Sequence, residues 1–448
     1  MKPKFRTFFT LTIVAVLLIS CDTSPLATGD PSMVEGYVTD GDGNQGFSKP
    51  AAGIEGATVT LARIKTDGEI QTVSNAEVTT DAEGKFTLET DLENERHLVV
   101  IATKNSNEWR AIVSASVQNG NTVRCEPLTT ESTVEAAVFE KFMAEYGEEM
   151  SKDRAALEIQ NAVNARTASE VYLLQPSYVT LATAVRNRID AKAQLLSANT
   201  GSGYPQAEMD SLRVQAQAQL ETQLYNANGN ASAIQSAYTA YNDAWMEVAL
   251  DAGIQADHYT QAEQAGYWSL TQSSTSLTGN AEAALAHKAA VHKANAAAYA
   301  AAQLFDSLEV INGAAASNVT NVEGFGQTLK ADIKSSTTLS GIEGAFQAFR
   351  DSLMAELAAA IDANVINVSA EDISAIDTEI RNNARVTLRN RIRSAVGLGG
   401  AINIDDVVGA YITFMSDVDA RYRNVGVLQQ NHAGVATSVT ILAHILAD

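Results

Sequence analysis

Two different periods of hydrophobic residues divide the chain. Over residues 33–128 apolar and polar positions alternate, for example around Val34 and Val38 and again around Val59 and Leu61. Alternation of this kind is typical of half-buried β-strands. Short clusters of Asp, Gly and Asn separate these segments and indicate turns. The pattern predicts about seven short strands, one of them over Ala111–Val117, arranged as an N-terminal β-sandwich.

Over residues 129–448 the spacing changes to the i, i+3, i+4 pattern of amphipathic helices. No proline follows Pro205, and alanine is abundant, so long helices are favoured. The segment from Ser132 to Glu135 has the pattern of a capping box, which predicts that the first helix begins there. Breaks rich in Asn, Gly and Ser predict loops at 199–205, 226–230, 273–280 and 397–400. We therefore expect a multidomain α+β chain with a large all-α second domain.

Two segments of this helical region repeat one another, because Ser232–Met246 aligns without gaps to Ser340–Met354. Each opens on Ser-x-x-Gln or Ser-x-x-Glu, which predicts an N-capped, duplicated helical unit. A weaker third copy starts at Ser132. The two strong copies carry apolar stripes, made of Ile234, Tyr238, Tyr241, Trp245 and Val248 in one and Ile342, Phe346, Phe349, Leu353 and Leu357 in the other.

Aromatic stripes can stack on sugars, but a stripe that continues into aliphatic residues is typical of a helix face buried in a core. We therefore interpret both stripes as core. Asp243 and Asp351 lie off the stripes and are expected to face water.

The first twenty residues have the parts of a secretory signal. A cationic start precedes the apolar run Phe8–Ile19, which is too short for the about 20 residues that span a bilayer. Leu18-Ile19-Ser20-Cys21 resembles the lipobox of bacterial lipoproteins, whose cysteine receives acyl chains and becomes the first residue of the mature protein. The resemblance implies a signal peptide over 1–20 and lipidation of Cys21. Residues 21–32 are rich in Pro, Gly, Ser and Asp, as in a flexible tether.

Three segments of the predicted sandwich resemble the carboxypeptidase regulatory-like domain, namely Val34–Asp40, Gly56–Leu61 and Thr79–Leu88. Their most specific part is the D-x-x-G-x-F block that begins at Asp81. The resemblance implies a transthyretin-like, carbohydrate-binding-like sandwich over residues 33–128, serving as an accessory or adhesion module without catalytic residues. A long loop from Asp40 to Gly53 stands where the family usually has a tight turn.

The charge of the chain excludes one class of partner. The formal net charge is −22, and it becomes −25 once Lys2, Lys4 and Arg6 leave with the signal. Nucleic acid is not expected as a partner, because phosphate binding requires clustered Lys and Arg. Besides Cys21 there is one further cysteine, Cys125, which we expect to be buried and inert.

The motifs of metal and catalytic sites are incomplete. Asp40-x-Asp42-x-Asn44 imitates the opening of a calcium loop, but Gln45 and Ala51 stand where that loop requires Gly and Glu. A solvated acidic loop is the favoured interpretation. The six histidines have no metal-ligand or catalytic spacing, and there is no nucleophile elbow or P-loop. We assign no catalytic residue and expect no cofactor.

Arg381, Arg385 and Arg389 follow acidic residues within one predicted helix. Basic residues late in a helix complement its dipole, which suffices to explain them. A basic docking face for an acidic partner is the alternative.

Together these patterns predict a lipid-anchored, extracytoplasmic protein of the bacterial envelope. The outer membrane or cell surface is favoured over the periplasmic face of the inner membrane. The protein is expected to act as a non-enzymatic binding or structural module of the adhesion type, held to the membrane by its lipid, with a glycan or a protein as partner. The alternative is an envelope hydrolase that acts on glycan or peptide through a carboxylate site in the helical domain.

Overall fold

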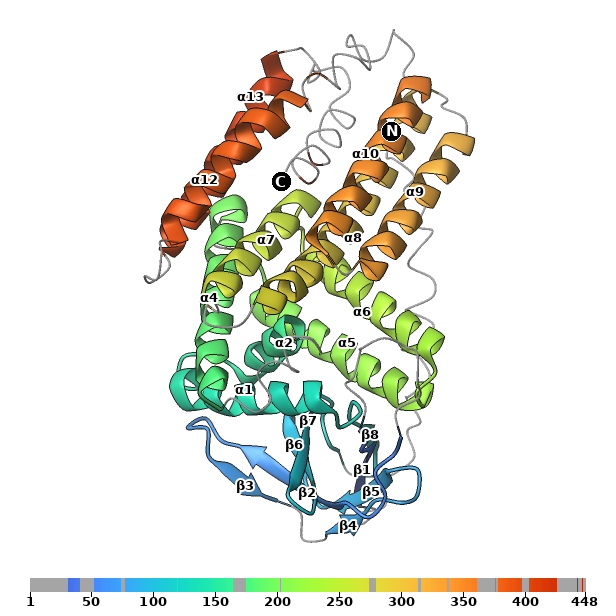
Figure 1. The fold of residues 1–448 in the computed structure, drawn as a ribbon, viewed down its shortest axis with the longest axis vertical. Coiled ribbons are helices and arrows are strands. Elements are labelled where there is room, and N and C mark those ends of the chain that lie inside the picture. The colour runs from blue at the N-terminus through green and yellow to red at the C-terminus, as the bar shows by residue number, and fades with distance from the viewer. Residues whose placement is uncertain are drawn as a thin grey trace.

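The fold is mixed α+β, with strands in the first part of the chain and helices in the rest, as Figure 1 shows. It is described by a computed structural model. The described residues are 31–40, 52–73, 77–118, 120–163, 175–201, 203–273, 279–312, 316–336, 338–360, 378–396 and 403–424, together with positions 375, 441 and 445.

The strands described form two sheets. One has the order β5-β1-β8, and the other has the order β3-β2-β6-β7 with β4 also paired to β2. β1 and β8 are parallel, and the other pairs are antiparallel. The strand bounds are β1 Ser32–Tyr37, β2 Thr58–Ile64, β3 Ile70–Thr72, β4 Val78–Thr79, β5 Lys85–Thr90, β6 Leu98–Lys104, β7 Asn107–Val113 and β8 Thr122–Arg124.

The two sheets share one hydrophobic core. Val34 and Leu88 from the first sheet pack in the same cluster as Leu61 and Val100 from the second. Cys125 lies in this cluster with no exposed surface, as predicted, and its thiol is free. Burial raises the pKa of that thiol well above its ordinary value, which makes it unreactive.

The D-x-x-G-x-F block forms a tight turn and a packing contact. The Asp81 carboxylate accepts the backbone N–H groups of Glu83 at 3.0 Å and of Lys85 at 2.8 Å. Gly84 has φ +77°, a conformation that L side chains rarely adopt. Phe86 then packs on Gly36, where a Cβ atom would lie 2.5 Å from the Phe86 ring.

Two details of the predicted strands are wrong. The strand expected over 111–117 lies at Asn107–Val113, and Val117 makes only an isolated bridge with Glu95. The sequence pattern also omitted β3 and β4. These strands have three and two residues, too few to show a period of two.

The described helical region contains eleven α-helices and one π-helical turn, η1, at Ile380–Ala384. The helix bounds are α1 Thr130–Tyr146, α2 Lys152–Ala162, α4 Gln175–Thr200, α5 Gln206–Ala227, α6 Ala231–Asp251, α7 Ala256–Ser273, α8 Gly279–Asn312, α9 Ala316–Ser335, α10 Leu339–Ala360, α12 Arg385–Val396 and α13 Ile404–Asn424. The breaks predicted at 199–205 and 226–230 fall between helices, as expected. Of the loop predicted at 273–280, residues 274–278 lie outside the described residues, while Gly279 and Asn280 already belong to α8. The fourth, at 397–400, lies outside the described residues.

The strands form one end of the molecule, and α1, α2 and α5 lie directly over them in Figure 1. Ile64, Val99 and Ile112 point from the larger sheet into a cluster that also holds Val138 of α1 and Leu181 of α4. The strands and the first helices therefore share a hydrophobic core across the boundary between residues 128 and 129.

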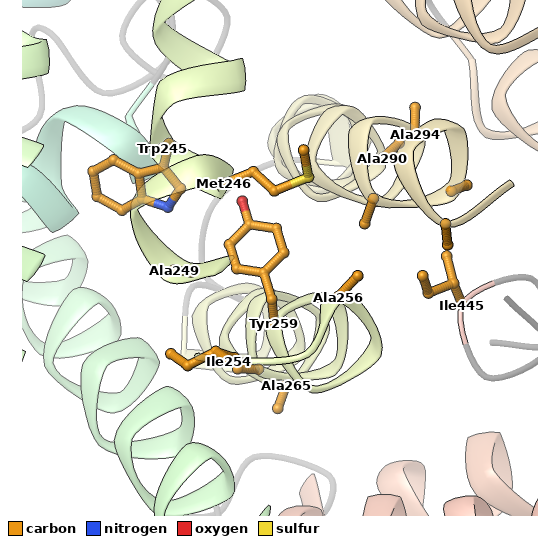
Figure 2. Close-up of a cluster of buried hydrophobic side chains, with 14 of the residues drawn as sticks. Trp245, Met246, Ala249, Ile254, Ala256, Tyr259, Ala265, Ala290, Ala294 and Ile445 are labelled. Atoms are coloured by element: carbon orange, nitrogen blue, oxygen red, sulfur yellow. The ribbon is translucent and has the colours of Figure 1, made fainter. Parts of the chain in front are cut away.

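The prediction that the aromatic stripes are core is confirmed. The buried members are Tyr241, Trp245, Phe346, Phe349 and Leu353, while Ile234, Tyr238, Val248 and Ile342 are partly buried against the same cluster. Figure 2 shows part of this cluster, in which Trp245 and Met246 lie close to Tyr259. The side chain of Leu357 lies outside the described residues.

Of the two aspartates expected to face water, one is exposed and the other is only partly exposed. Asp351 is exposed. Asp243 is only partly exposed and forms a 3.1 Å ion pair with Lys330, whose long side chain reaches it from α9.

The predicted starts of three helices are wrong by a few residues. The side chain of Thr129 caps α1 by accepting the N–H of Ser132, so Ser132 is the third helical residue and not the cap. α6 is capped by Asn230, which accepts the N–H of Ala233 at 3.0 Å. Thr338, directly before α10, accepts the N–H of Gly341 at 3.1 Å. In each case a cap-forming residue upstream of the predicted serine accepts the N–H of the third helical residue.

Candidate functional site

The residues proposed from sequence lie mostly outside the described part of the chain. Cys21, Asp42 and Asn44 are among those not described. Asp40 is described, and its carboxylate accepts the N–H of Ala52 at 2.8 Å, so it closes the base of the long loop. Among the described residues no group of three or more His, Cys, Asp or Glu side chains is arranged to hold a metal ion.

Of the three arginines proposed as a docking face, the structure describes the side chain of Arg385 alone. The side chains of Arg381 and Arg389 lie outside the described residues, and that of Arg385 is half-buried at the start of α12. A half-buried arginine is a weaker docking group than the exposed one that the sequence suggested.

The densest group of charged side chains among the described residues is a buried network of Glu158, Arg188, Lys192 and Glu263, which no sequence motif predicted. Arg188 donates from Nε to Glu158 at 3.0 Å and from Nη2 to Glu263 at 2.7 Å. The Lys192 ammonium lies 2.7 and 3.0 Å from the two Glu158 oxygens, and 2.7 Å from Glu263 Oε1. Two cations and two anions are thus joined in a closed group.

The network is shielded from water, with side-chain exposures of 9 % for Glu158, 5 % for Arg188, 7 % for Lys192 and 3 % for Glu263. Burial favours the neutral acids, but the charges of Lys192 and Arg188 outweigh it and hold the pKa values of Glu158 and Glu263 below the ordinary range. Burial also lowers the pKa of Lys192, although both glutamates oppose that effect.

Three helices position these four side chains. Arg188 and Lys192 are one turn apart on α4, so they project from the same face. Glu158 comes from α2 and Glu263 from α7. α4 and α7 approach closely at Gly266, where a Cβ atom would lie 2.8 Å from Cγ of Lys192. A glycine at this position makes room for the aliphatic stems of the two cations.

An aromatic residue closes one side of the network. The indole N–H of Trp245 donates to Glu263 at 3.3 Å, and the Lys192 ammonium lies 5.4 Å from the centre of the Trp245 ring. Arg213 of α5 stacks on that ring at 4.1 Å and donates to the Trp245 carbonyl. Cation–π contacts of this kind are strongest in a site without water.

A second hydrogen-bonded group adjoins Trp245. Tyr259 bonds through its hydroxyl to Nδ1 of His292 at 2.7 Å, and Nε2 of His292 faces the Asn161 carbonyl oxygen at 3.3 Å. Because an amide oxygen only accepts, the contact with Asn161 requires a hydrogen on Nε2. His287 instead bonds to the carbonyl of Ile333, so the two histidines do not share a site, as their spacing predicted.

The members of the charge network lie far apart in the sequence, between residues 158 and 263, and no local motif predicts it. One sequence feature could have indicated the network. Arg188 and Lys192 lie one turn apart on a helix face whose other residues are mostly apolar, as on a face buried in the core. Chemically, each carboxylate is already bound by both cations. The group is therefore suited to fixing the helices relative to one another, rather than to exchanging protons with a substrate in water.

Comparison of the chain with protein-family models, with curated proteins and with solved structures found no match. Within the described residues, the helices are all too short or too polar to cross a membrane.

Proposed function

We propose that this chain is a lipid-anchored protein of the bacterial envelope that acts outside the cytoplasm as a binding or structural module. The observation that carries the proposal is the lipobox-like Leu18-Ile19-Ser20-Cys21 directly after a cationic start and an apolar run. One acyl chain anchors only marginally, whereas the two or more chains of a lipoprotein anchor stably. With a net charge of −22 the protein itself offers little attraction to an anionic membrane surface, so the lipid is the anchor.

The described part of the structure favours a non-enzymatic role. Its most concentrated acid–base group holds Glu158 and Glu263 buried and bound to two cations, whereas a glycan or peptide hydrolase needs carboxylates that reach the substrate. We also propose that the two sheets form a β-sandwich of the carboxypeptidase regulatory-like type. The shared sheet core and the Asp81 turn support that assignment.

We further propose that α6 and α10 are copies of one duplicated helical unit. Their aligned aromatic stripes enter the same hydrophobic cluster, which supports a common origin for the two packing faces. A binding function for the helical region would then use its outer surface, with a glycan or a protein as the partner.

The anchor is tested by replacing Cys21 with serine. In cells that express the full chain, the Cys21→Ser variant should leave the membrane fraction and lose incorporation of labelled palmitate. Cys125→Ser is the matched control, since Cys125 is buried among the strands and should not be acylated. Membrane retention and labelling of the Cys21→Ser protein would contradict the proposal.

The partner is tested separately with the full chain on a glycan array. Saturable binding to one class of glycan would support a carbohydrate partner. A blank array would instead direct the search to envelope proteins.

A further inference from the structure

The Lys192 ammonium is held in contact with two buried carboxyl groups. Its nitrogen lies 2.7 and 3.0 Å from the two oxygens of Glu158, so the amine and the carboxyl group are already adjacent in the folded protein. A second carboxylate, that of Glu263, touches the same nitrogen at 2.7 Å. All three groups are more than nine-tenths buried. Holding two reacting groups together in a folded protein removes the entropic cost of bringing them into contact, and with aligned groups the effective concentration reaches about 10⁵ M or more.

We propose that Lys192 and Glu158 condense to form an intramolecular isopeptide bond. The Lys192 ammonium first gives up one proton, which Glu263 passes to Oε1 of Glu158. The neutral amine then attacks the Glu158 carboxyl carbon, so that a bond forms between Nζ and Cδ and the bond between Cδ and Oε1 breaks. Two of the three ammonium protons leave with that oxygen as water, and one stays on the new amide. Ammonium and carboxylate thus give amide and water, with no oxidant, reductant or other reactant.

The surrounding groups fit each part of this reaction. Arg188 donates to Oε2 of Glu158, the oxygen that becomes the amide carbonyl and that carries negative charge in the tetrahedral intermediate. Oε1 is the oxygen nearer to Lys192 and is the one that leaves. Glu263 lies within reach of the nitrogen and can carry a proton from it to Oε1.

The charge balance of the site favours the product. Four charges are buried before the reaction, and charges kept from water are costly even when they are paired. The condensation removes one cation and one anion, and leaves Arg188 paired with Glu263 at 2.7 Å. The first proton transfer also removes the Lys192 charge, which is one of the two that lower the pKa of Glu158.

Of the two glutamates, Glu158 is the better placed to be attacked by the Lys192 amine. Lys192 donates hydrogen bonds to both oxygens of Glu158, at 2.7 and 3.0 Å, and forms an ion pair of 2.7 Å with Oε1 of Glu263. Glu263 is also held by the indole N–H of Trp245, which fixes it beside the reacting pair. We therefore assign Glu263 to proton transfer.

The proposal is tested by peptide mapping of the full-length wild-type chain. Trypsin should release residues 155–166, which contain Glu158, joined to residues 189–213, because trypsin does not cut after an acylated Lys192. The branched peptide should be lighter than the sum of its two parts by one water. Recovery of free 155–166 and of a peptide ending at Lys192, with no branched product, would overturn the proposal.

The same digest contains a matched control. Lys65 and Glu69 form an ion pair of 2.6 Å, as close as the Lys192 pair, but it is exposed on the strand side. Its peptides should be recovered unlinked. Linkage there as well would show that contact alone, or the sample treatment, produces the bond.

Variants at Glu263 test the assigned proton carrier. Glu263→Gln keeps both reacting groups and should lower the linked fraction at least tenfold, while Glu263→Asp should restore part of it. Circular dichroism of both variants checks that they are folded. Full linkage in a folded Glu263→Gln protein would remove Glu263 from the reaction, and linkage in Lys192→Met would overturn the identity of the amine.

Discussion

Glu221 on α5 is the single residue whose ionisation matters most at the junction of strands and helices. It has no exposed surface, and both of its oxygens accept the N–H of Ser114, at 3.3 and 3.2 Å. Burial raises the pKa of Glu221 well above its ordinary value, and the nearby Glu126 adds to the effect, while the bonds from Ser114 oppose it. The folded protein therefore holds Glu221 protonated over a pH range in which the unfolded chain has ionised it.

Linkage gives the sign of the resulting pH dependence. Because the folded pKa is raised, the stabilisation by Glu221 is complete below the ordinary glutamate pKa and is lost as pH rises through the folded pKa. Glu221→Gln, which mimics the protonated acid, should remove this loss. Its free energy of unfolding relative to wild type should rise with pH between those two pKa values, by up to about 1.4 kcal/mol per pH unit.

Urea unfolding of both proteins at a series of pH values measures this difference. Glu89→Gln on β5 is the control, because it makes the same substitution at an exposed position. A flat difference for Glu221→Gln across the acid-to-neutral range would show that Glu221 ionises normally in the folded state.

At the scale of elements, helix existence was predictable from sequence and helix starts were not. The Ser-x-x-Gln pattern at Ser232 and Gln235 is a valid capping signal, but Asn230 lies two residues earlier and caps equally well. The cap is decided by where the chain leaves the tight turn at Asn228, which has φ 45°. That backbone geometry depends on how α5 and α6 pack, and a local motif does not contain it.

The cap of α6 gives a discriminating pair of substitutions. Asn230→Ala removes the acceptor of the Ala233 N–H and should lower the free energy of unfolding by about 1 kcal/mol. Ser232→Ala should change it by less than about half of that, because Ser232 is an exposed residue of the first turn. Chemical denaturation of the two variants beside wild type measures both values. If Ser232→Ala lowers the free energy of unfolding more than Asn230→Ala does, Ser232 and not Asn230 caps the helix, as the sequence pattern predicts.

The charge network could not be predicted from sequence, because it depends on contacts between helices and not on a local motif. The aromatic stripe of α6 could be assigned to the core because its spacing alone is informative. Glu158, Lys192 and Glu263 belong to no regular pattern in the sequence, and a single charged residue in a helix is ordinarily expected to face water. They become a site only because α4 and α7 pack at Gly266 and bring α2 alongside. Contacts that depend on helix packing are set by the whole core and not by any local pattern.

At the scale of the whole molecule, the strands and the first helices are joined by more than the chain. Their shared cluster contains Ile64, Val99 and Ile112 from the larger sheet. Polar contacts cross the same boundary, including His97 to Asp153 at 2.7 Å and the Ser114 bonds to Glu221. Apolar packing and polar contacts therefore both fix the larger sheet to the first helices.

This shared core predicts how a cavity in it will act. Ile112→Ala should lower the free energy of unfolding by about 2–5 kcal/mol, and it should weaken strands and helices together, because the lost methyl groups pack among side chains of α1 and α4. Hydrogen exchange followed by mass spectrometry reports each part separately. Peptides of β6, α1 and α4 should lose protection by the same amount. Leu61→Ala is the control, since Leu61 lies in the core between the two sheets and should weaken the strand peptides first. If Ile112→Ala weakens only the strand peptides, the strands and helices are separate cooperative units despite their contact.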